Sequence, residues 1–160
     1  MAVDDPAVSD FIRRSMVARI ATLSRSGRPS ITPLYFVYMN GRVCLGTAVW
    51  TLAAREAKTN PRVSVLLQNE QNPDDGRTLR ITGRATVRTD AHLMRSSALR
   101  MALKYILTPG ALRNRLSNLH LLRAEVRYKA QSAEKGPACI IEVTVEHVEF
   151  LDNTLVPAQE

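Results

Sequence analysis

The sequence predicts a mainly β protein with inserted helices, an α+β fold built on a small antiparallel barrel. Several segments alternate apolar and polar residues, which is the period of a half-buried strand, and helical periodicity is confined to a few insertions. Those insertions are too few to supply the helical crossovers that parallel strands require. We therefore expect antiparallel strands that close into a barrel, with helices appended to it.

A short helix is expected to open the chain. Asp5 is a suitable N-cap and Pro6 a suitable first helical residue. Apolar residues then recur on one helical face, which predicts a helix that lies on the core. These residues are Val8, Phe11, Ile12 and Met16.

Three strands are predicted next. The patterns at Ala18–Leu23 and Ser30–Met39 are typical of strands, and the residues between them supply a turn. Asn40-Gly41 is the strongest hairpin signal in the chain, because both residues tolerate the positive φ of a type I′ turn. Three antiparallel strands in a row are therefore expected.

Pro33 interrupts the second of these strands, where it cannot donate a ladder hydrogen bond. The position is expected to be a sheet edge, a bulge, or a place where a ligand takes over the backbone contacts. Considered by itself, the residue favours a bulge.

The central segment 42–67 reads as a strand, a turn at Gly46-Thr47, a short helix opened by Thr51, a stop at Asn60-Pro61 and a second apolar strand. The start of such a helix carries unpaired N–H groups and the positive end of the helix dipole. Proteins bind phosphates with this arrangement, so we consider the turn and helix a candidate anion site. The alternative is a plain connector helix.

The second half of the chain begins with a polar loop over 69–76 and a strand at Arg77–Arg88. Alternation places apolar residues on one face of this strand and arginines on the other, where water or negative charge is expected. Asp90 caps a helical excursion that runs to about residue 126, and a final strand covers Ala138–Phe150. The excursion either walls a substrate pocket or extends a dimer contact.

The 160 residues, 45% of them hydrophobic, indicate a single domain over 1–160. No apolar run approaches the roughly 20 residues that span a bilayer, and the first residues do not resemble a signal peptide. We expect a cytoplasmic protein without membrane contact. Cys44 and Cys139 show no metal-type spacing, so buried reduced thiols are expected, and the histidines predict no metal site.

The net charge of +7 raises the question of nucleic-acid binding. However, the basic residues are scattered through every element, and only 5% of the residues are aromatic, too few for an obvious base-stacking surface. We therefore expect no nucleic-acid partner. A basic cleft for a small anionic ligand fits the same charge.

Seven short motifs resemble, in order and spacing, the pyridoxamine-phosphate-oxidase-like split barrels, a group that includes flavin- and deazaflavin-dependent oxidoreductases. The resemblance covers residues 8 to 90 well and the last strand, 139–152, moderately. The motifs are Ile20-Ala21-Thr22-Leu23, Gly27-Arg28-Pro29, Thr32-Pro33-Leu34-Tyr35-Phe36, Asn40-Gly41-Arg42, Leu45-Gly46-Thr47, Asn60-Pro61-Arg62-Val63 and Arg80-Ile81-Thr82-Gly83-Arg84-Ala85.

The resemblance implies a six-stranded split barrel that forms a homodimer, with FMN or a deazaflavin in a groove at the subunit interface. It implies an oxidoreductase that acts on a small organic substrate, in which the cofactor carries the hydride chemistry. No catalytic acid or base is therefore identified. The second strand would pass the isoalloxazine ring of the cofactor. The phosphate would be faced by Gly46, Thr47 and Thr51. Two further residues, Thr78 and Arg80, would come from the other subunit. The ring-facing residues would be Ile31, Thr32, Pro33, Leu34 and Tyr35.

The chain departs from the family pattern at the start of the short helix. The family commonly has Ser-Arg-Lys there, and this chain has Thr51-Leu52-Ala53, so both cations that hold the phosphate are missing. Each charge-assisted hydrogen bond is worth about 1.5–3 kcal/mol, so the loss weakens a phosphate ligand unless other cations replace them. Arg55 and Lys58, one turn further along, are candidate substitutes.

Two further questions stay open at the level of sequence. Trp50, which precedes the short helix, is either a residue that stacks over a planar ring or an anchor in a dimer interface. Leu52 and Ala53 also leave room for a second hypothesis, in which the barrel has no redox activity and binds haem or another planar ligand. The same departure also allows a third case, in which the protein binds no cofactor.

Overall fold

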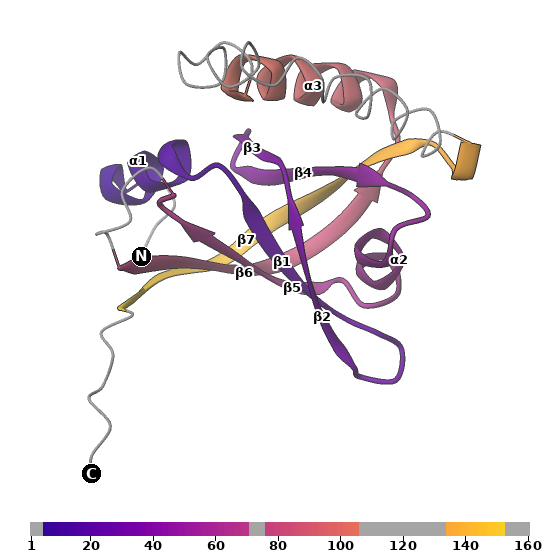
Figure 1. Ribbon diagram of the computed structural model, residues 1–160, viewed down its shortest axis with the longest axis horizontal. Helices are drawn as coiled ribbons and strands as arrows, with labels where there is room; N and C mark the ends of the chain where they lie inside the picture. Colours follow the sequence, from indigo (N-terminus) through magenta and orange to yellow (C-terminus); the bar gives the residue numbers. More distant parts are fainter. Residues whose placement is uncertain (1–4, 71–75, 106–133, 153–160) are drawn as a thin grey trace, which may run out of the picture.

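The computed structural model describes residues 5–70, 76–105 and 134–152 (Figure 1). The order of helices and strands follows the prediction, and the part of the helical excursion beyond residue 105 lies outside these ranges. No helix in the described ranges is long and apolar enough to cross a membrane. The elements are α1 (Pro6–Arg14), β1 (Ala18–Leu23), β2 (Pro29–Leu34), β3 (Phe36–Met39), β4 (Arg42–Ala48), α2 (Leu52–Thr59), β5 (Arg62–Gln68), β6 (Arg77–Arg88), α3 (Ala91–Tyr105) and β7 (Ala138–Asp152).

The strands form one curled antiparallel sheet in the order β2-β1-β5-β6-β7-β4-β3. The predicted strand Ser30–Met39 is broken at Tyr35, so that β2 pairs with β1 while β3 pairs with β4. This break gives seven strands instead of the six expected. It also brings the two ends of the sheet together, because the N–H of Gly46 in β4 donates to the carbonyl oxygen of Tyr35 at 3.0 Å.

The expected bulge at Pro33 is wrong. The register between β1 and β2 runs without a shift from Ala18↔Leu34 to Leu23↔Pro29. Pro33 instead occupies an edge strand, where a residue without an N–H costs no ladder hydrogen bond. The register shift in the described sheet falls between β6 and β7, at Thr82 and Gly83.

Local signals elsewhere are confirmed. Asn40 and Gly41 have φ values of 52° and 74°, the positive values that a type I′ hairpin turn requires. The carboxylate of Asp5 accepts from the N–H of Ala7 at 2.9 Å and caps α1. Cys44 and Cys139 are buried and unbridged, and burial raises the pKa of each thiol to about 11.

The core fills the inside of the curled sheet and continues under α1. The apolar face of β6 is buried as predicted, while on its other face the guanidinium of Arg80 donates to Glu149 at 2.7 Å. Arg88 donates to Asp90 at 2.9 Å, so acidic partners take up part of the arginine row. The largest fully buried side chains are Phe36, Ile20, Leu45, Leu67, Leu79, Ile81, Ile141, Val8, Val43, Val65, Val143 and Val148.

A buried carboxylate fixes α2 to the sheet. Glu56 of α2 accepts hydrogen bonds from the hydroxyl of Thr22 in β1, at 2.6 Å, and from that of Ser30 in β2. The bonds from Ser30 and then Thr22 hold the pKa of Glu56 below its usual value of 4.5. The helix that begins at the candidate anion site is therefore attached to the strands that pass it.

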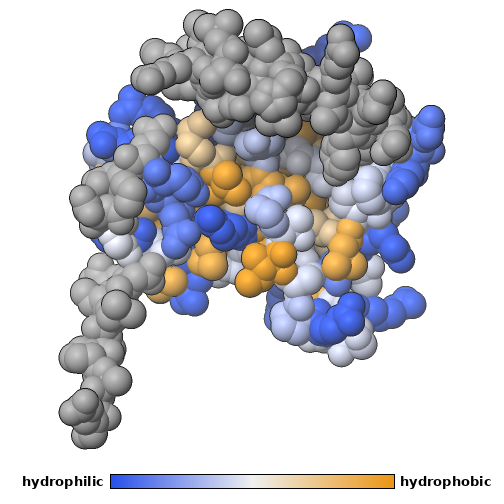
Figure 2. Space-filling model, viewed as in Figure 1, coloured by the Kyte–Doolittle hydropathy of each residue, from blue (hydrophilic) through white to orange (hydrophobic). Residues whose placement is uncertain are grey.

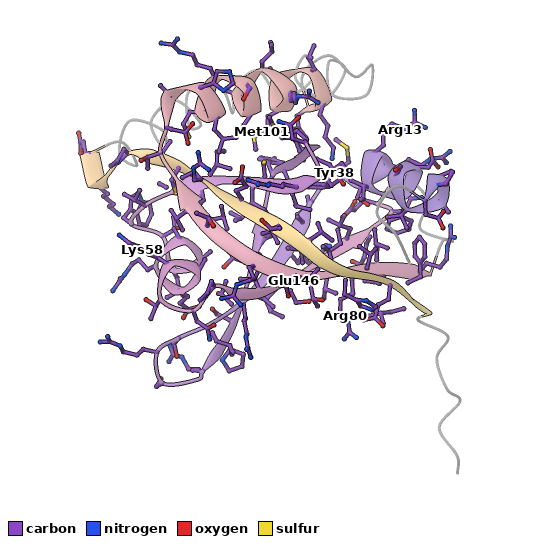
Figure 3. The ribbon with its side chains drawn as sticks, turned by 180° about the vertical axis from the view of Figure 1, so that it is seen from behind. Arg13, Tyr38, Lys58, Arg80, Met101 and Glu146 are labelled. Atoms are coloured by element: carbon purple, nitrogen blue, oxygen red, sulfur yellow. The ribbon has the colours of Figure 1, made fainter. Side chains whose placement is uncertain are left out.

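We expect Glu56→Gln to reduce the free energy of unfolding by about 1 kcal/mol at neutral pH, because the amide replaces a charged acceptor. A carboxyl group whose pKa is lowered on folding stabilises the protein above its unfolded pKa and loses this contribution as the pH falls. The deficit should therefore shrink below pH 4.5. Urea unfolding at neutral and acidic pH measures it, with Glu146→Gln, at an exposed residue of β7 (Figure 3), as the control. An equal loss in both variants would contradict the expectation.

Candidate functional site

A cavity of about 890 Å³ lies where the break between β2 and β3, the β4–α2 turn, α3 and the start of β7 meet. α3 runs over β3 and β4 (Figure 1), and hydrophobic residues gather in the middle of this face (Figure 2). The residues that line the cavity are Val17, Pro33, Leu34, Tyr35, Gly46, Thr47, Ala48, Trp50, Thr51, Met94, Ala98, Met101, Gly136, Ala138, Cys139 and Ile140.

The described lining contains no charged side chain. Its polar groups are few, and most of its surface comes from aliphatic, methionine and aromatic side chains. Ligand cavities commonly have this composition, with a few polar groups that fix the orientation of the ligand. The cavity is therefore suited to a largely apolar group.

The α2 side of the cavity offers threonine hydroxyl groups rather than side-chain charge. The hydroxyl of Thr51 donates to the carbonyl oxygen of Ala48 at 2.8 Å, so the hydroxyl of Thr47, 3.0 Å from it, must be the donor in their mutual bond. Thr51 also caps the helix by accepting from the N–H of Ala54 at 3.4 Å. The N–H groups of the first two helical residues have no intrahelical partner, as at the start of any α-helix.

Trp50 lines the cavity and carries a buried hydrogen-bond donor. Its indole nitrogen Nε1 is buried and has no hydrogen-bond partner within the described ranges. A buried donor of this kind is costly unless a ligand or water accepts its proton. Because this nitrogen is closed to solvent, the part of Trp50 that lines the cavity is not its Nε1.

A cation lies behind the same ring. The Nζ atom of Lys135 is 5.1 Å from the centre of the Trp50 ring. The segment that carries it is held to the wall, because the N–H of Val49 donates to the carbonyl oxygen of Pro137 at 3.1 Å. At Gly136 a Cβ would lie only 3.0 Å from Cγ2 of Val49, so glycine permits this close approach.

α3 forms the roof of the cavity. Met94, Ala98 and Met101 share one helical face, and the Cε atom of Met101 would lie 3.1 Å from a Cβ at Gly46. Tyr105 fixes the end of the helix: its hydroxyl accepts from the N–H of Phe36 at 3.0 Å and lies 2.8 Å from the carbonyl oxygen of Met16. The described part of the helical excursion, α3, thus walls a cavity, in line with one of the two roles expected for the excursion.

The structure brings together some of the residues predicted for the cofactor site. Those that line the cavity are Pro33, Leu34, Tyr35, Gly46, Thr47, Trp50 and Thr51. Ile31 is exposed and Thr32 half-buried on β2, and neither lines the cavity.

The predicted cations lie elsewhere. Arg55 and Lys58 are exposed on α2, and Figure 3 shows Lys58 pointing outward. Thr78 is buried in β6, and Arg80, which pairs with Glu149, lies at the opposite end of the molecule from α3. Both were expected to come from the other subunit, so their place in one chain does not bear on that prediction. The structure therefore does not bring the proposed substitutes for the missing phosphate-binding cations to the cavity.

Several lining residues were not predicted. They come from α3 and from the segment that leads into β7, and they include Met94, Ala98, Met101, Gly136 and Cys139. The helical spacing of the two methionines indicates a packed face, but a repeat of this kind does not say which part of the sheet the face covers.

Comparison with known proteins places the fold. The sequence matches the family model of pyridoxamine 5'-phosphate oxidase over residues 4–152. No curated protein matches it significantly.

Solved structures match at low sequence identity and therefore show the fold alone. A conserved hypothetical protein from Mycobacterium tuberculosis has a TM-score of 0.67 at 17% identity, over 93% of this chain and 84% of that one. An F420 reductase has a TM-score of 0.58 at 16% identity, over 88% of this chain and 94% of that one. The haem storage protein HutZ from Vibrio cholerae has a TM-score of 0.62 at 18% identity, over 95% of each chain. Given the family match and these split-barrel neighbours, the chain belongs to the pyridoxamine 5'-phosphate oxidase family.

Proposed function

We propose that the protein is an oxidoreductase that binds a flavin-type cofactor, FMN or a deazaflavin, in the 890 Å³ cavity and acts on a small organic molecule. The observation that carries the proposal is the cavity itself, which opens at the predicted turn and helix. Its volume lies in the usual range for ligand pockets, and its uncharged walls suit a planar ring system. When bound, such a cofactor supplies hydride transfer, and the protein supplies position and electrostatics.

The residues present fit the ring of the cofactor. Pro33–Tyr35 and the α3 residues Ala98 and Met101 would hold it from two sides. Trp50 lines the same cavity and would contact the cofactor through the exposed part of its side chain. If this function is correct, Trp50 forms part of the cofactor cavity rather than an anchor in a dimer interface.

The anionic tail of the cofactor would be held more weakly. Thr51 lines the cavity at the start of α2, where helices bind anions, and Lys135 is a cation that lies against the lining residue Trp50. At the two positions where the family pattern has cations, Leu52 is 48% exposed and Ala53 is fully buried in the core. A lysine at 53 would therefore be buried, so only position 52 can regain a cation without unpacking α2.

The second candidate is a binding module without redox activity that takes haem or another planar ligand. The uncharged lining favours it, since FMN and deazaflavins carry an anionic tail. Against haem, the described lining contains no histidine, and the pKa of the Cys139 thiol, raised to about 11 by burial, disfavours a thiolate ligand, which leaves Tyr35, Met94 and Met101 as side chains of a type that ligates haem iron. The flavin proposal is preferred because the matching family model is that of pyridoxamine 5'-phosphate oxidase.

We propose that the protein acts as a homodimer whose interface borders the cavity. Ile31 and Tyr35 have large side chains that are 64% and 63% exposed, and Tyr35 also lines the cavity. Clustered exposed apolar side chains of this kind often mark an interface. Light scattering should then give twice the chain mass of 17.8 kDa.

Titration of the purified protein with FMN, riboflavin, a deazaflavin and haemin tests the function. We expect FMN or the deazaflavin to bind at one molecule per chain, with a change in cofactor absorbance and fluorescence. Reduction of the bound cofactor by a nicotinamide or chemical reductant, followed by reoxidation by an added acceptor, would extend the result to redox activity. Binding of haemin alone would favour the module without redox activity.

We expect Leu52→Arg to tighten FMN binding by roughly 10- to 100-fold, because one charge-assisted hydrogen bond to the phosphate is regained. Riboflavin, which lacks the phosphate, should bind as before. Leu99→Arg is the matched control, since Leu99 is 63% exposed and lies on α3 rather than at the start of α2, where the phosphate would bind. If Leu52→Arg and Leu99→Arg raise the affinity for FMN equally, the cause is long-range electrostatic attraction. If Leu52→Arg raises the affinities for riboflavin and FMN equally, the phosphate binds elsewhere.

A further inference from the structure

A second cavity, of about 480 Å³, lies between α1, β3 and α3. Figure 3 shows Tyr38 of β3 in the space between the two helices, with Arg13 beside it on α1. Its walls combine apolar side chains with basic ones, unlike those of the first cavity. The residues that line it are Ser9, Ile12, Arg13, Met16, Val37, Tyr38, Arg100, Leu103 and Lys104.

The charge in this lining is of one sign. Arg13, Arg100 and Lys104 contribute three cations, and none of the described lining residues is acidic. Arg13 has a partner of its own, Asp10, at 2.5 Å. Arg100 and Lys104 form no salt bridge within the described ranges, so their charges are available to a ligand.

The ammonium group of Lys104 is partly buried, and a bound anion would stabilise its charged form. Its Nζ atom lies 3.6 Å from the centre of the buried Phe36 ring. Burial lowers the pKa of Lys104 to about 8, although the negative charge of Glu70 acts in the other direction. The carboxylate of Glu70 is already used, since it accepts from the N–H of Met16 at 3.0 Å and pairs with Arg19 at 3.5 Å.

We propose that this second cavity binds an organic carboxylate with an apolar tail, whose carboxylate lies between Lys104 and Arg100. The tail would contact Ile12, Val37 and Leu103, and the negative charge would offset the cost of the partly desolvated ammonium group. The site shares no lining residue with the first cavity, so this proposal does not depend on a flavin-type cofactor.

Calorimetric titration with octanoate tests the proposal, with 1-octanol as the uncharged comparison. We expect one octanoate per chain and binding of octanol weaker by roughly tenfold or more, the value of one lost ion contact. Lys104→Met, which keeps the length of the side chain but removes its charge, should weaken octanoate by a similar factor. Lys58→Met removes a lysine on the exposed side of α2 and should leave the affinity within about twofold of the original.

Two further measurements distinguish binding at this site from binding in the first cavity or elsewhere on the surface. Ala98→Trp narrows only the first cavity and should leave octanoate binding unchanged. At pH 8 octanoate should drive uptake of up to about half a proton, because the carboxylate raises the pKa of Lys104 from about 8. The other charged or titratable groups around Lys104 are Arg13 of α1, Tyr38 of β3, Glu70 after β5, and Arg100 and Tyr105 of α3.

The proposal is overturned if octanoate fails to bind at millimolar concentration, or if octanol binds as tightly as octanoate. It is also overturned if Ala98→Trp abolishes octanoate binding while Leu99→Trp, on the same helix, leaves it unchanged, which would assign the ligand to the first cavity. Thermal unfolding checks that Lys104→Met is folded. If it is not, Arg100→Gln, at an exposed residue, takes its place with the same expected loss.

Discussion

Replacing Gly83 with alanine is expected to lower the free energy of unfolding by about 3 kcal/mol or more, the upper end of what overpacking costs. A Cβ at this position would lie 2.0 Å from the carbonyl oxygen of Thr144 in the neighbouring strand. That oxygen belongs to backbone in the long β6–β7 pairing, so it cannot move aside as a flexible side chain would. The register shift beside Gly83 depends on this close approach.

Urea unfolding measures the loss against two other glycines. At Gly76 a Cβ would meet nothing within 4 Å, so Gly76→Ala should change stability by less than about 0.5 kcal/mol. At Gly46 the new atom would meet the flexible end of Met101 at 3.1 Å, so Gly46→Ala should fall between the two. Equal losses at positions 76 and 83 would mean that the Thr144 contact does not set the cost. A Gly83→Ala chain that does not fold beside a folded Gly76→Ala would agree with the expected clash.

Features of the fold that depend on a few neighbouring residues could be predicted from the sequence. The Asn40-Gly41 turn, the cap at Asp5 and the alternation along β6 are properties of short segments, and all three occur as expected. The break at Tyr35 could not be predicted in this way. It arises because the sheet curls until one strand leaves the β1 edge and joins β4, which depends on how all seven strands are arranged.

The candidate site shows the same division. The β2 segment, the Gly46-Thr47 turn and the start of α2 were predicted, because motif and helix-start signals identify them. From the sequence alone, Leu52 and Ala53 are equivalent, because each stands where the family pattern has a cation. In the structure they differ, because Ala53 lies in the core and Leu52 lies at the surface. Likewise, Lys135 is far from Trp50 in sequence, and only the path of the chain into β7 places its ammonium group over the indole.

Replacing Ala98 with tryptophan is expected to weaken binding of FMN and riboflavin by roughly 100-fold or more, equivalent to about 2.7 kcal/mol of binding free energy. Ala98 stands between Met94 and Met101 on the face of α3 that lines the cavity, and its small side chain leaves open the space in which the ring would lie. An indole at this position would occupy that space. Fluorescence titration with both flavins measures the loss.

Leu99→Trp is the matched control, because it adds the same side chain to the same helix at a residue that is 63% exposed and does not line the cavity. It should bind both flavins as the unmodified protein does, and thermal unfolding should show both variants folded. A parallel loss in the two variants would mean that the indole disturbs α3 rather than filling the cavity. If Ala98→Trp retains full affinity, the ring does not lie under α3, and the cofactor site must be sought outside this cavity. A loss confined to Ala98→Trp would place the ring between α3 and the β2–β3 break.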